Sequence, residues 1–473
     1  MGEGAEDDVA ALVERLRAAG VRYVCCSVVD SGGINRVKCV PVEKLERAAR
    51  RGIGMPLSWS MAMSNDHFAQ PEGKGGPSGD LRLKPDLAAA VQLAAQPFWA
   101  WAPTDQHTQD GGVFPLCQRS FLKRMVTGAR DAGFGLLMSY EFEWFTMRDE
   151  RRASPEDPDV GARDVPQSGA GYMPVHDGPG FSSAAWAAVH ELAEDLLLAL
   201  DAQGMDVEVF HPEYADGQME VSFAPVEPLA AADRNVLFRH TARAVSERHG
   251  CRASFAPVRV AGQVASGCHL HFSVRDAGGR NLFSGGRERL ELTQPGEAFL
   301  AGVLAEIGPL TALGCPTVPS YERLQPQRWA CAYRIWGHEN REAALRVIQG
   351  MAGERACTAN AEFRAIDAAC NPYLMAGALV AAGLNGIDRS LTLPAPFDGD
   401  PHLAGDDVRA ALGVRRLPQS LSEAAEELAA SEVLQAAMGE DLHGAIVEVR
   451  RAEAAADEVR PLDDLIAEHL WRF

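Results

Sequence analysis

Lysine is scarce in this chain and is missing from most of its length. All five lysines lie at or before Lys123 in a sequence of 473 residues. The later part of the chain therefore has no lysine for a Schiff base and no Gly-Lys-Ser/Thr phosphate-binding loop. The ten cysteines include one adjacent pair, Cys25 and Cys26, but no Cys-x-x-Cys spacing. This usage indicates reduced thiols rather than a disulfide framework.

The chain also lacks an excess of positive charge and a long hydrophobic run. Its formal net charge of -20 argues against nucleic acid or an anionic membrane surface as a partner. The most apolar run, Pro372–Ile387, is short and carries three glycines, which favours a buried helix over a membrane span. The acidic first residues are not typical of a signal peptide. Together with the cysteine usage, these features predict a cytoplasmic protein.

Length and patterning predict two domains. A chain of 473 residues exceeds what one simple core holds. The first hundred residues mix helical and strand patterns, which is typical of a small α+β domain. We expect a junction at Asp110-Gly-Gly, and therefore domains over 1–109 and 110–473. The patterns predict helices over 8–19, 42–51, 118–132 and 183–202, strands over 21–29, 34–40 and 88–102, and mostly helix from Gln419 onward.

Four short stretches of the larger part alternate polar and apolar residues. A β-strand sends alternate side chains to opposite faces. In Tyr140–Trp144, Glu141 and Glu143 thus share one face and three aromatic rings share the other. The same alternation groups the polar residues of the other three stretches: Glu220 with Ser222, His269 with His271 and Ser273, and Glu362 with Arg364.

These polar faces carry an unusual density of carboxylates and imidazoles. For one strand alone, a solvated outer face explains the pattern. Several such strands are different, because neighbouring carboxylates repel one another and a bound divalent cation removes the repulsion. Glutamates with a histidine and without a cysteine pair suit Mg²⁺ or Mn²⁺ better than Zn²⁺. The residues alone predict a metal site built from strands.

Read in order, the larger part of the chain carries two groups of short motifs. The first group is Glu141-x-Glu143, His211-Pro-Glu213, Gly217-Gln-x-Glu220 and Ser266-Gly-Cys-His269-x-His271-x-Ser273. The second group is Arg323-Leu-x-Pro326, Trp336-Gly-x-x-Asn340-Arg341, Arg346, Glu362-x-Arg364 and Asn371-Pro-Tyr-Leu374. One such motif is a weak signal, whereas the whole set in this order is a strong one, and it resembles the motifs of the glutamine synthetase family.

The resemblance implies a fold, an assembly and a set of ligands. The expected α+β fold has a small N-terminal β-grasp domain and a large catalytic domain whose curved antiparallel sheet is backed by helices. Subunits of this family form homo-oligomeric rings with active sites between neighbours. ATP and glutamate are substrates, and each site holds two or more Mg²⁺ or Mn²⁺ ions.

Matched positions imply roles for individual residues. One metal would take Glu143, Glu213 and Glu220, and the other Glu141, His269 and Glu362. Glutamate would contact Arg323, Arg364 and Ala265, although Val264-Ala265 replaces the usual Asn-Gly. ATP would contact Glu208, His271, Ser273, Arg341 and Arg346, and we expect Arg341 to act in catalysis as well. Simpler roles compete with these: Arg341 and Arg346 as surface arginines, Glu208 as a solvated strand residue, and His211 as a core histidine.

The acceptor site departs from the family pattern. Members that use ammonia hold the ammonium ion with carboxylates, one of which lies six residues after the arginine of Arg-Leu-x-Pro. Trp329 occupies that position here, and the corresponding small-domain stretch Pro56–Met63 contains no acid. We therefore expect an organic amine to contact Trp329, and Glu213 is our candidate for the base that deprotonates it.

The predicted activity is an ATP-dependent ligation of glutamate to an amine. The γ-carboxylate would first become a γ-glutamyl phosphate, and the amine would then displace phosphate. Two alternatives remain from the sequence: an ordinary glutamate–ammonia ligase, and a catalytically inactive ring-forming homologue. The complete set of six metal ligands argues against the inactive homologue.

Overall fold

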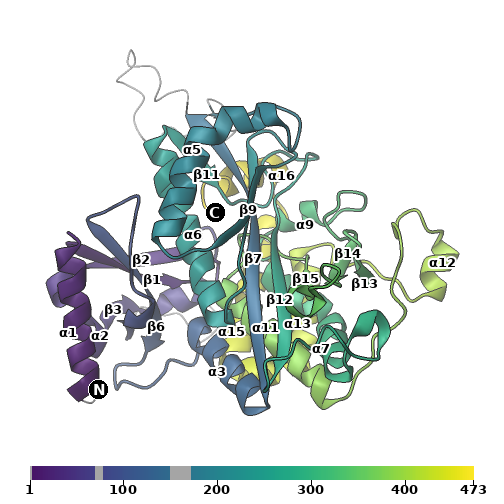
Figure 1. Ribbon diagram of the computed structural model, residues 1–473, viewed down its shortest axis with the longest axis horizontal. Helices are drawn as coiled ribbons and strands as arrows, with labels where there is room; N and C mark the ends of the chain where they lie inside the picture. The colour runs from purple at the N-terminus through teal and green to yellow at the C-terminus, as the bar shows by residue number, and fades with distance from the viewer. Residues whose placement is uncertain (1–2, 70–77, 150–171) are drawn as a thin grey trace.

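Two β-sheets organise the described residues, 3–69, 78–149 and 172–473, of the computed structural model. The smaller sheet belongs to the N-terminal part, drawn in purple at the left of Figure 1, and the larger sheet is centred on the long strand β7 (Phe134–Asp149). Strands and helices alternate along the chain, which confirms the mixed helix-and-sheet class. The predicted limits of the two domains stay a prediction.

The smaller sheet has strand order β2-β1-β6-β4-β3, with β5 paired to β6. Its strands are β1 (Tyr23–Val29), β2 (Asn35–Pro41), β3 (Ile53–Pro56), β4 (Asp80–Pro85), β5 (Val91–Gln92) and β6 (Trp99–His107). The predicted hairpin β1–β2 is confirmed, and its turn holds Gly33 at φ 85°, a conformation that suits glycine. Helices α1 (Glu3–Ala18) and α2 (Leu45–Arg51) accompany this sheet.

The strand material predicted over 88–102 is confirmed in part, because the range holds β5 and the beginning of β6 with a turn between them. The chain turns between β5 and β6, where the Gln96 amide donates to the Leu93 carbonyl at 3.0 Å. Pro97 follows and has no N–H for a strand ladder. The apolar residues of this stretch pack inward from a turn as well as from a strand, so their pattern alone did not separate the two.

The larger sheet has strand order β13-β14-β15-β12-β7-β10-β9, and β8 and β11 also pair with β7. Its further strands are β8 (Tyr172–Pro174), β9 (Val207–Pro212), β10 (Gln218–Phe223), β11 (Cys251–Ser254), β12 (Cys268–Asp276), β13 (Tyr333–His338), β14 (Ala343–Ile348) and β15 (Asn360–Phe363). Neighbouring strands are antiparallel as expected, except that β13 and β14 run parallel. Only four residues join these two strands, and Glu339 begins the return at φ 52°.

Helices cover one face of the larger sheet (Figure 1). The helices nearest the sheet are α3 (Gln118–Asp131), α5 (Ser183–Ala202), α6 (Pro228–Arg248), α7 (Gln294–Ala305), α8 (Ile307–Gly314) and α11 (Pro372–Asp388). Behind them, α13 (Leu421–Ala430), α14 (Glu432–Met438) and α15 (Glu440–Asp457) pack on α8, on α11 and on one another. The helices α16 (Leu462–His469), α9 (Ser320–Arg323), α10 (Arg355–Thr358) and α12 (Asp406–Ala411) lie elsewhere. The predicted helix over 183–202 and the helical C-terminal part are confirmed. No single described helix is long and apolar enough to cross a membrane, although the bent pair α7–α8 passes that test of length and composition together.

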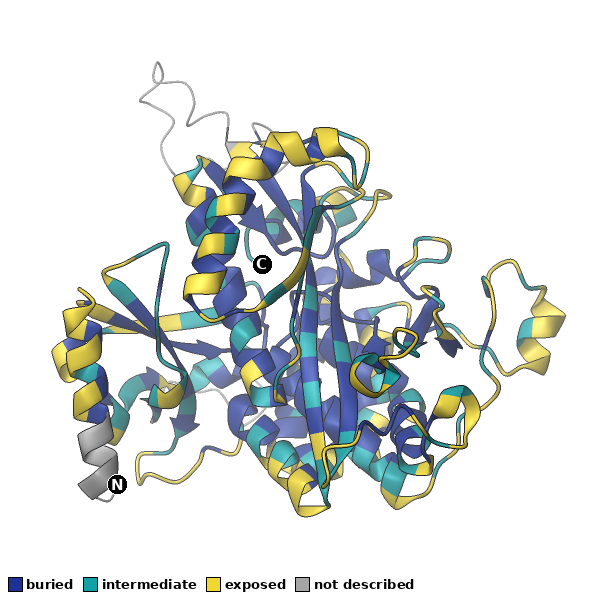
Figure 2. Cartoon of the chain, in the orientation of Figure 1, coloured by how far each residue is buried: buried dark blue, intermediate teal, exposed yellow. Residues whose placement is uncertain are grey.

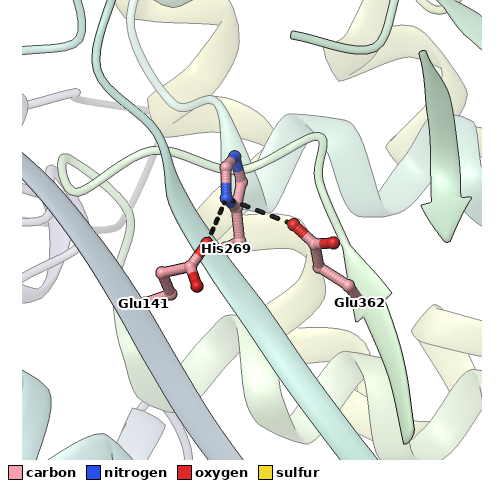
Figure 3. A group of neighbouring side chains, drawn as sticks. All are labelled: Glu141, His269 and Glu362. Carbon is pink, nitrogen blue, oxygen red and sulfur yellow. Dashed lines mark hydrogen bonds and ion pairs between the residues drawn. The ribbon is translucent and has the colours of Figure 1, made fainter. Parts of the chain in front are cut away.

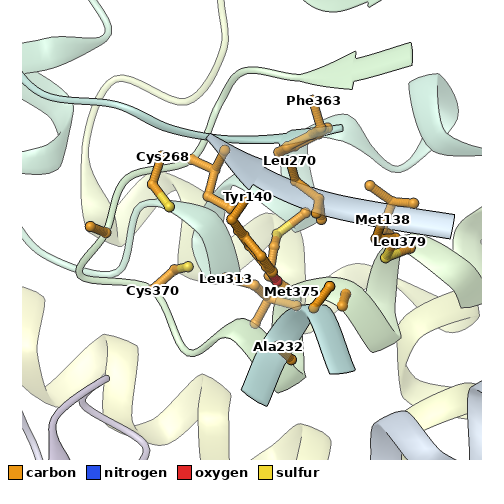
Figure 4. Close-up of a cluster of buried hydrophobic side chains, with 14 of the residues drawn as sticks. Met138, Tyr140, Ala232, Cys268, Leu270, Leu313, Phe363, Cys370, Met375 and Leu379 are labelled. Carbon is orange, nitrogen blue, oxygen red and sulfur yellow. The ribbon is translucent and has the colours of Figure 1, made fainter. Parts of the chain in front are cut away.

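The core lies between this sheet and the helices behind it. Figure 4 shows Met138, Tyr140 and Leu270 of β7 and β12 packed toward Met375 and Leu379 of α11. The Tyr140 hydroxyl donates to the carbonyl of Pro372 at 2.8 Å, so its buried polar atom has a partner. Burying the apolar face of each strand in this way leaves the opposite, polar face for chemistry (Figure 2).

Buried polar contacts join the N-terminal part to the rest of the chain. Arg119 of α3 lies within 3.1 Å of carboxylate oxygens of Asp86, Asp105 and Asp233. The β1–β2 turn receives a hydrogen bond at Ser31 from Arg450 of α15, at 2.9 Å. These bonds hold the smaller sheet against the helices that carry the larger one.

Candidate active site

Strand register brings the predicted acids and histidines into one row. Glu220 of β10 stands opposite both His211 of β9 and Glu143 of β7. His269 of β12 stands opposite Glu141 of β7. Farther along the row, Glu362 of β15 pairs in register with His271 of β12 and with Arg346 of β14. Six neighbouring strands thus place their polar faces on the same side of the sheet.

The first group of donors consists of Glu141, His269 and Glu362 (Figure 3). The Nδ1 atom of His269 lies 3.1 Å from Glu141 Oε1 and 3.2 Å from Glu362 Oε1. One ligand atom from each residue lies within 4.8 Å of the others. Two carboxylates and an imidazole at this spacing can enclose one divalent cation.

The second group consists of His211, Glu213 and Glu220, again with ligand atoms within 4.8 Å of one another. His211 Nε2 lies 3.6 Å from an oxygen of each glutamate. The interpretation of His211 as a core histidine is wrong, because its ring lies on the same face as Glu220 and stacks on the exposed Phe181. The sequence signal for this placement of His211 was its position two residues before Glu213 in the motif His211-Pro-Glu213.

Glu143 lies beside both groups and is held by hydrogen bonds. Its Oε2 accepts from the Gln218 side-chain amide and from the Gly267 backbone N–H, each at 2.9 Å. Its Oε1 lies 3.8 Å from His269 Nε2. A Cβ on Gly267 would lie 2.6 Å from that same ring nitrogen, so glycine leaves the space between the groups open.

The charges of these groups call for a cation. Burial and the neighbouring carboxylates of Glu141 and Glu143 raise the pKa of Glu220 to about 10. Burial raises the pKa of Glu143 to about 7 as well, although nearby arginines oppose this. Burial and the adjacent Arg364 lower the pKa of His269 well below its usual value, which leaves a neutral imidazole able to ligate. A divalent ion would offset the repulsion, and the donor set fits Mg²⁺ or Mn²⁺.

Glu362 remains ionised at the centre of the row. Burial opposes its charge, but the adjacent Arg364 guanidinium outweighs burial and lowers its pKa to about 2. The Arg364 guanidinium donates to Glu362 Oε1, and Arg346 Nη1 donates to Glu362 Oε2 at 3.0 Å. Arg346 is therefore half-buried and paired, not a free surface arginine.

Buried arginine nitrogens offer sites for an anionic substrate. Arg323 Nη1 and Arg364 Nε are buried and have no hydrogen-bond partner among the described residues. Arg323 also lies beside the first group, with its Nη2 3.3 Å from His269 Nε2. Because a buried, unpaired guanidinium N–H is costly, these atoms are suited to receive carboxylate oxygens from outside the chain.

The remaining predicted residues lie at different depths. His271 is half-buried and its Nδ1 lies 3.0 Å from Asn360 Oδ1, while Ser273 is buried on β12. Ala265 is half-buried, and its carbonyl accepts from Gln218. The other two are exposed: Glu208 on the edge strand β9, outside both donor groups, and Arg341 in the loop after β13.

Trp329 lies at the open edge of the site. Its side chain is 70% exposed, and its backbone φ is 54°. Arg364 Nη2 donates to the Trp329 carbonyl at 2.8 Å, and the Trp329 N–H donates to Glu342 Oε1 at 3.0 Å. Glu342 was not among the predicted residues, since only the fold brings it beside Trp329.

Comparisons with known proteins agree with this geometry. The family model described as "Glutamine synthetase, catalytic domain" matches residues 115–464. The chain is 43% identical to the gamma-glutamylpolyamine synthetase GlnA3 of Streptomyces coelicolor over 99% of this chain and 97% of the relative. It is 30% identical to the glutamine synthetase of Halobacterium salinarum over 95% of this chain and 93% of the relative.

Solved structures show the same fold. The chain superposes with a TM-score of 0.82 on a crystal structure of a glutamine synthase homolog, at 31% identity over 96% of this chain and 99% of the other. An ADP complex of GmaS gives a TM-score of 0.79, at 28% identity over 95% of this chain and 97% of the other. The chain belongs to the glutamine synthetase family and is an ATP-dependent ligase.

Proposed function

We propose that this enzyme joins the γ-carboxylate of L-glutamate to an organic amine, and that polyamines are among its acceptors. The observation that carries the proposal is Trp329, an exposed aromatic residue at the position where the family resemblance implies a carboxylate in members that use ammonia. The similarity to a gamma-glutamylpolyamine synthetase over nearly the full length of both chains supports it. An exposed indole at the acceptor edge favours an alkyl chain over a bare ammonium ion.

The reaction needs activation of a poor electrophile. A carboxylate does not release oxide, so ATP transfers its terminal phosphoryl group to the γ-carboxylate and ADP leaves. The amine nitrogen then forms a bond to the γ-carbon, and the bond from that carbon to the phosphate oxygen breaks. The products are a γ-glutamylamide, ADP and phosphate, with one proton lost from the nitrogen.

The residues divide this work as follows. The first donor group, with Glu141, and the second donor group, with Glu213, would each hold one Mg²⁺ or Mn²⁺ ion. These ions supply positive charge that offsets the negative charge of the phosphates. Arg323 and Arg364 would orient glutamate through their unpaired N–H groups. Arg341 is exposed, and its long, flexible side chain is suited to contact a transferred phosphoryl group. Glu213 remains our candidate base.

Two features favour a cytoplasmic enzyme that forms homo-oligomers. The ten cysteines are free, which suits a reducing compartment. Next to the second donor group, the side chains of Phe181 and Tyr214 are 63% and 69% exposed. Large apolar rings at a site edge favour cover by another subunit, in keeping with sites that lie between neighbours in a ring.

An amine screen tests the proposal. Purified enzyme is incubated with glutamate, ATP, Mg²⁺ or Mn²⁺, and one acceptor at a time: ammonium, a monoamine, a diamine or spermidine. The γ-glutamyl products are identified and quantified by mass spectrometry. We expect an organic amine to give at least a tenfold higher kcat/KM than ammonium. Ammonium as the best acceptor would instead support an ordinary glutamate–ammonia ligase.

The variant Trp329→Glu sharpens this experiment. It restores a carboxylate at the acceptor edge, so the ratio of ammonium to organic-amine turnover should rise at least tenfold. Trp329→Leu is the matched control, because it removes the indole without adding charge and should not favour ammonium. An equal rise with both variants would contradict the assigned role of Trp329.

A further inference from the structure

Glu342 is a buried carboxylate with one oxygen unused. The residue directly precedes β14 and is 7% exposed. Oε1 accepts the Trp329 N–H, whereas Oε2 is buried and has no hydrogen-bond partner among the described residues. A buried carboxylate oxygen without a hydrogen-bond donor costs folding free energy. A donor from a bound ligand would remove this cost.

A series of hydrogen bonds connects this carboxylate to the catalytic row. Glu362 is bound by Arg364, Arg364 donates to the Trp329 carbonyl, and the Trp329 N–H donates to Glu342. The Trp329 peptide therefore lies between the first donor group and Glu342. An acceptor whose reacting nitrogen is near the donor group would extend past Trp329 toward Glu342.

The segment that carries Trp329 is held by these contacts. Gln327, Trp329 and Cys331 have φ angles of 60°, 54° and 56°, which residues with a side chain rarely adopt. Such backbone persists where its surroundings fix it, and it concentrates at ligand sites. Here the fixing groups are Arg364 on one side and Glu342 on the other.

The charge balance around Glu342 favours a cation. Arg364 and Arg346 both bind Glu362, and Arg346 also binds Glu339 at 2.6 Å. Burial raises the pKa of Glu342 and Asp400 adds to the rise, although the hydrogen bond from Trp329 and the nearby Arg364 and His402 oppose it. A bound ammonium group would offset both effects.

We infer that Glu342 receives the second, protonated nitrogen of a diamine or polyamine acceptor, whose methylene chain lies along Trp329. This inference rests on the proposed function and narrows its substrate class to amines with two nitrogens separated by several methylenes. The near nitrogen loses its proton and attacks the γ-glutamyl phosphate. The far nitrogen keeps its charge and pairs with Glu342 Oε2.

Butane-1,4-diamine and pentylamine test the inference on the unmodified enzyme. The two have chains of the same length and differ in whether the far end is a charged nitrogen or a methyl group. A charge-assisted hydrogen bond in a buried site predicts at least a tenfold higher kcat/KM for the diamine, mainly through a lower KM. Equal kcat/KM for the two amines would overturn the inference.

Substitutions test whether Glu342 causes the preference for the diamine over pentylamine. Glu342→Gln should reduce the ratio of diamine to pentylamine kcat/KM at least tenfold, and Glu342→Asp, which keeps the charge, should retain more of it. Glu354→Gln, at an exposed glutamate in the same part of the chain, is the control and should keep the wild-type ratio. A melting scan of each variant checks that it is folded.

The outcomes distinguish the two proposals. If amines are used but Glu342→Gln lowers turnover of both test amines by the same factor, the role of Glu342 is wrong and the proposed function stands. If glutamate is joined to ammonium alone, the proposed function fails, and the inference fails with it. A diamine preference that Glu342→Gln removes supports both.

Discussion

Replacing Glu220 by glutamine should stabilise the metal-free enzyme and weaken its response to metal. Burial, together with the neighbouring carboxylates of Glu141, Glu143 and Glu213, raises the pKa of Glu220 from 4.5 to about 10. A carboxyl group with a raised folded-state pKa stabilises the fold below its unfolded pKa, and that stability is lost as the pH rises from there toward the folded pKa. At neutral pH the metal-free protein therefore bears an electrostatic cost that Glu220→Gln removes.

The size of the effect follows from the shift. Between pH 4.5 and about pH 7.5, at about 1.4 kcal/mol per pH unit, the lost stability is about 4 kcal/mol, or about 3 kcal/mol after allowance for partial exposure of the side chain. For a chain of this length the unfolding entropy is on the order of 1 kcal/mol per kelvin, so the variant should melt about 3 °C higher than wild type in EDTA.

Metal should narrow the difference in Tm between the two proteins from about 3 °C to about 1 °C. Each bound ion at about 100 times its Kd adds about 2.7 kcal/mol. Wild type, with two sites, should gain about 5 °C in Mn²⁺, and Glu220→Gln, with one site weakened, about 3 °C. Scanning calorimetry with EDTA and with Mn²⁺ measures both, and Glu191→Gln on the exposed face of α5 is the control. If Mn²⁺ raises Tm equally in wild type and Glu220→Gln, the metal assignment of Glu220 is refuted.

Three further predictions concern other parts of the chain. Gly267→Ala places a Cβ 2.6 Å from His269 Nε2, so kcat/KM with any acceptor should fall at least about 100-fold with little change in Tm; an unchanged rate would show that Gly267 does not border the reacting groups. Burial raises the pKa of Glu453 from 4.5 to about 7, so wild type should lose about 3 kcal/mol of stability as pH rises from about 5 to 8. Glu453→Gln should lose less in denaturant titrations at the two pH values, and a loss equal to that of wild type would contradict the assignment. Arg119→Met leaves the buried Asp233 carboxylate without its ion pair and should cost about 3–5 kcal/mol of unfolding free energy, measured by urea titration against Arg130→Met, an exposed arginine of the same helix.

The faces of single strands could be predicted because they depend on neighbours in the chain. Alternation placed Glu141 with Glu143 on one side and Tyr140, Phe142 and Trp144 on the other, and the three aromatic residues are buried in the core. The motif set then pointed to the family and to the acids that meet in the site. Local pattern did not locate the turn within 88–102, because a turn and a strand bury their apolar residues alike.

The sequence by itself determined which chemical groups face the same way on each strand, since a period of two is a property of the local backbone. Only the tertiary structure decided which strands stand side by side. His211 joins Glu220 because β9 pairs with β10, and Glu362 meets His269 because β15 pairs with β12. Glu342 reaches Trp329 through a return of the chain with unusual backbone angles. These contacts depend on long-range register, which packing of the whole sheet selects and no short stretch encodes.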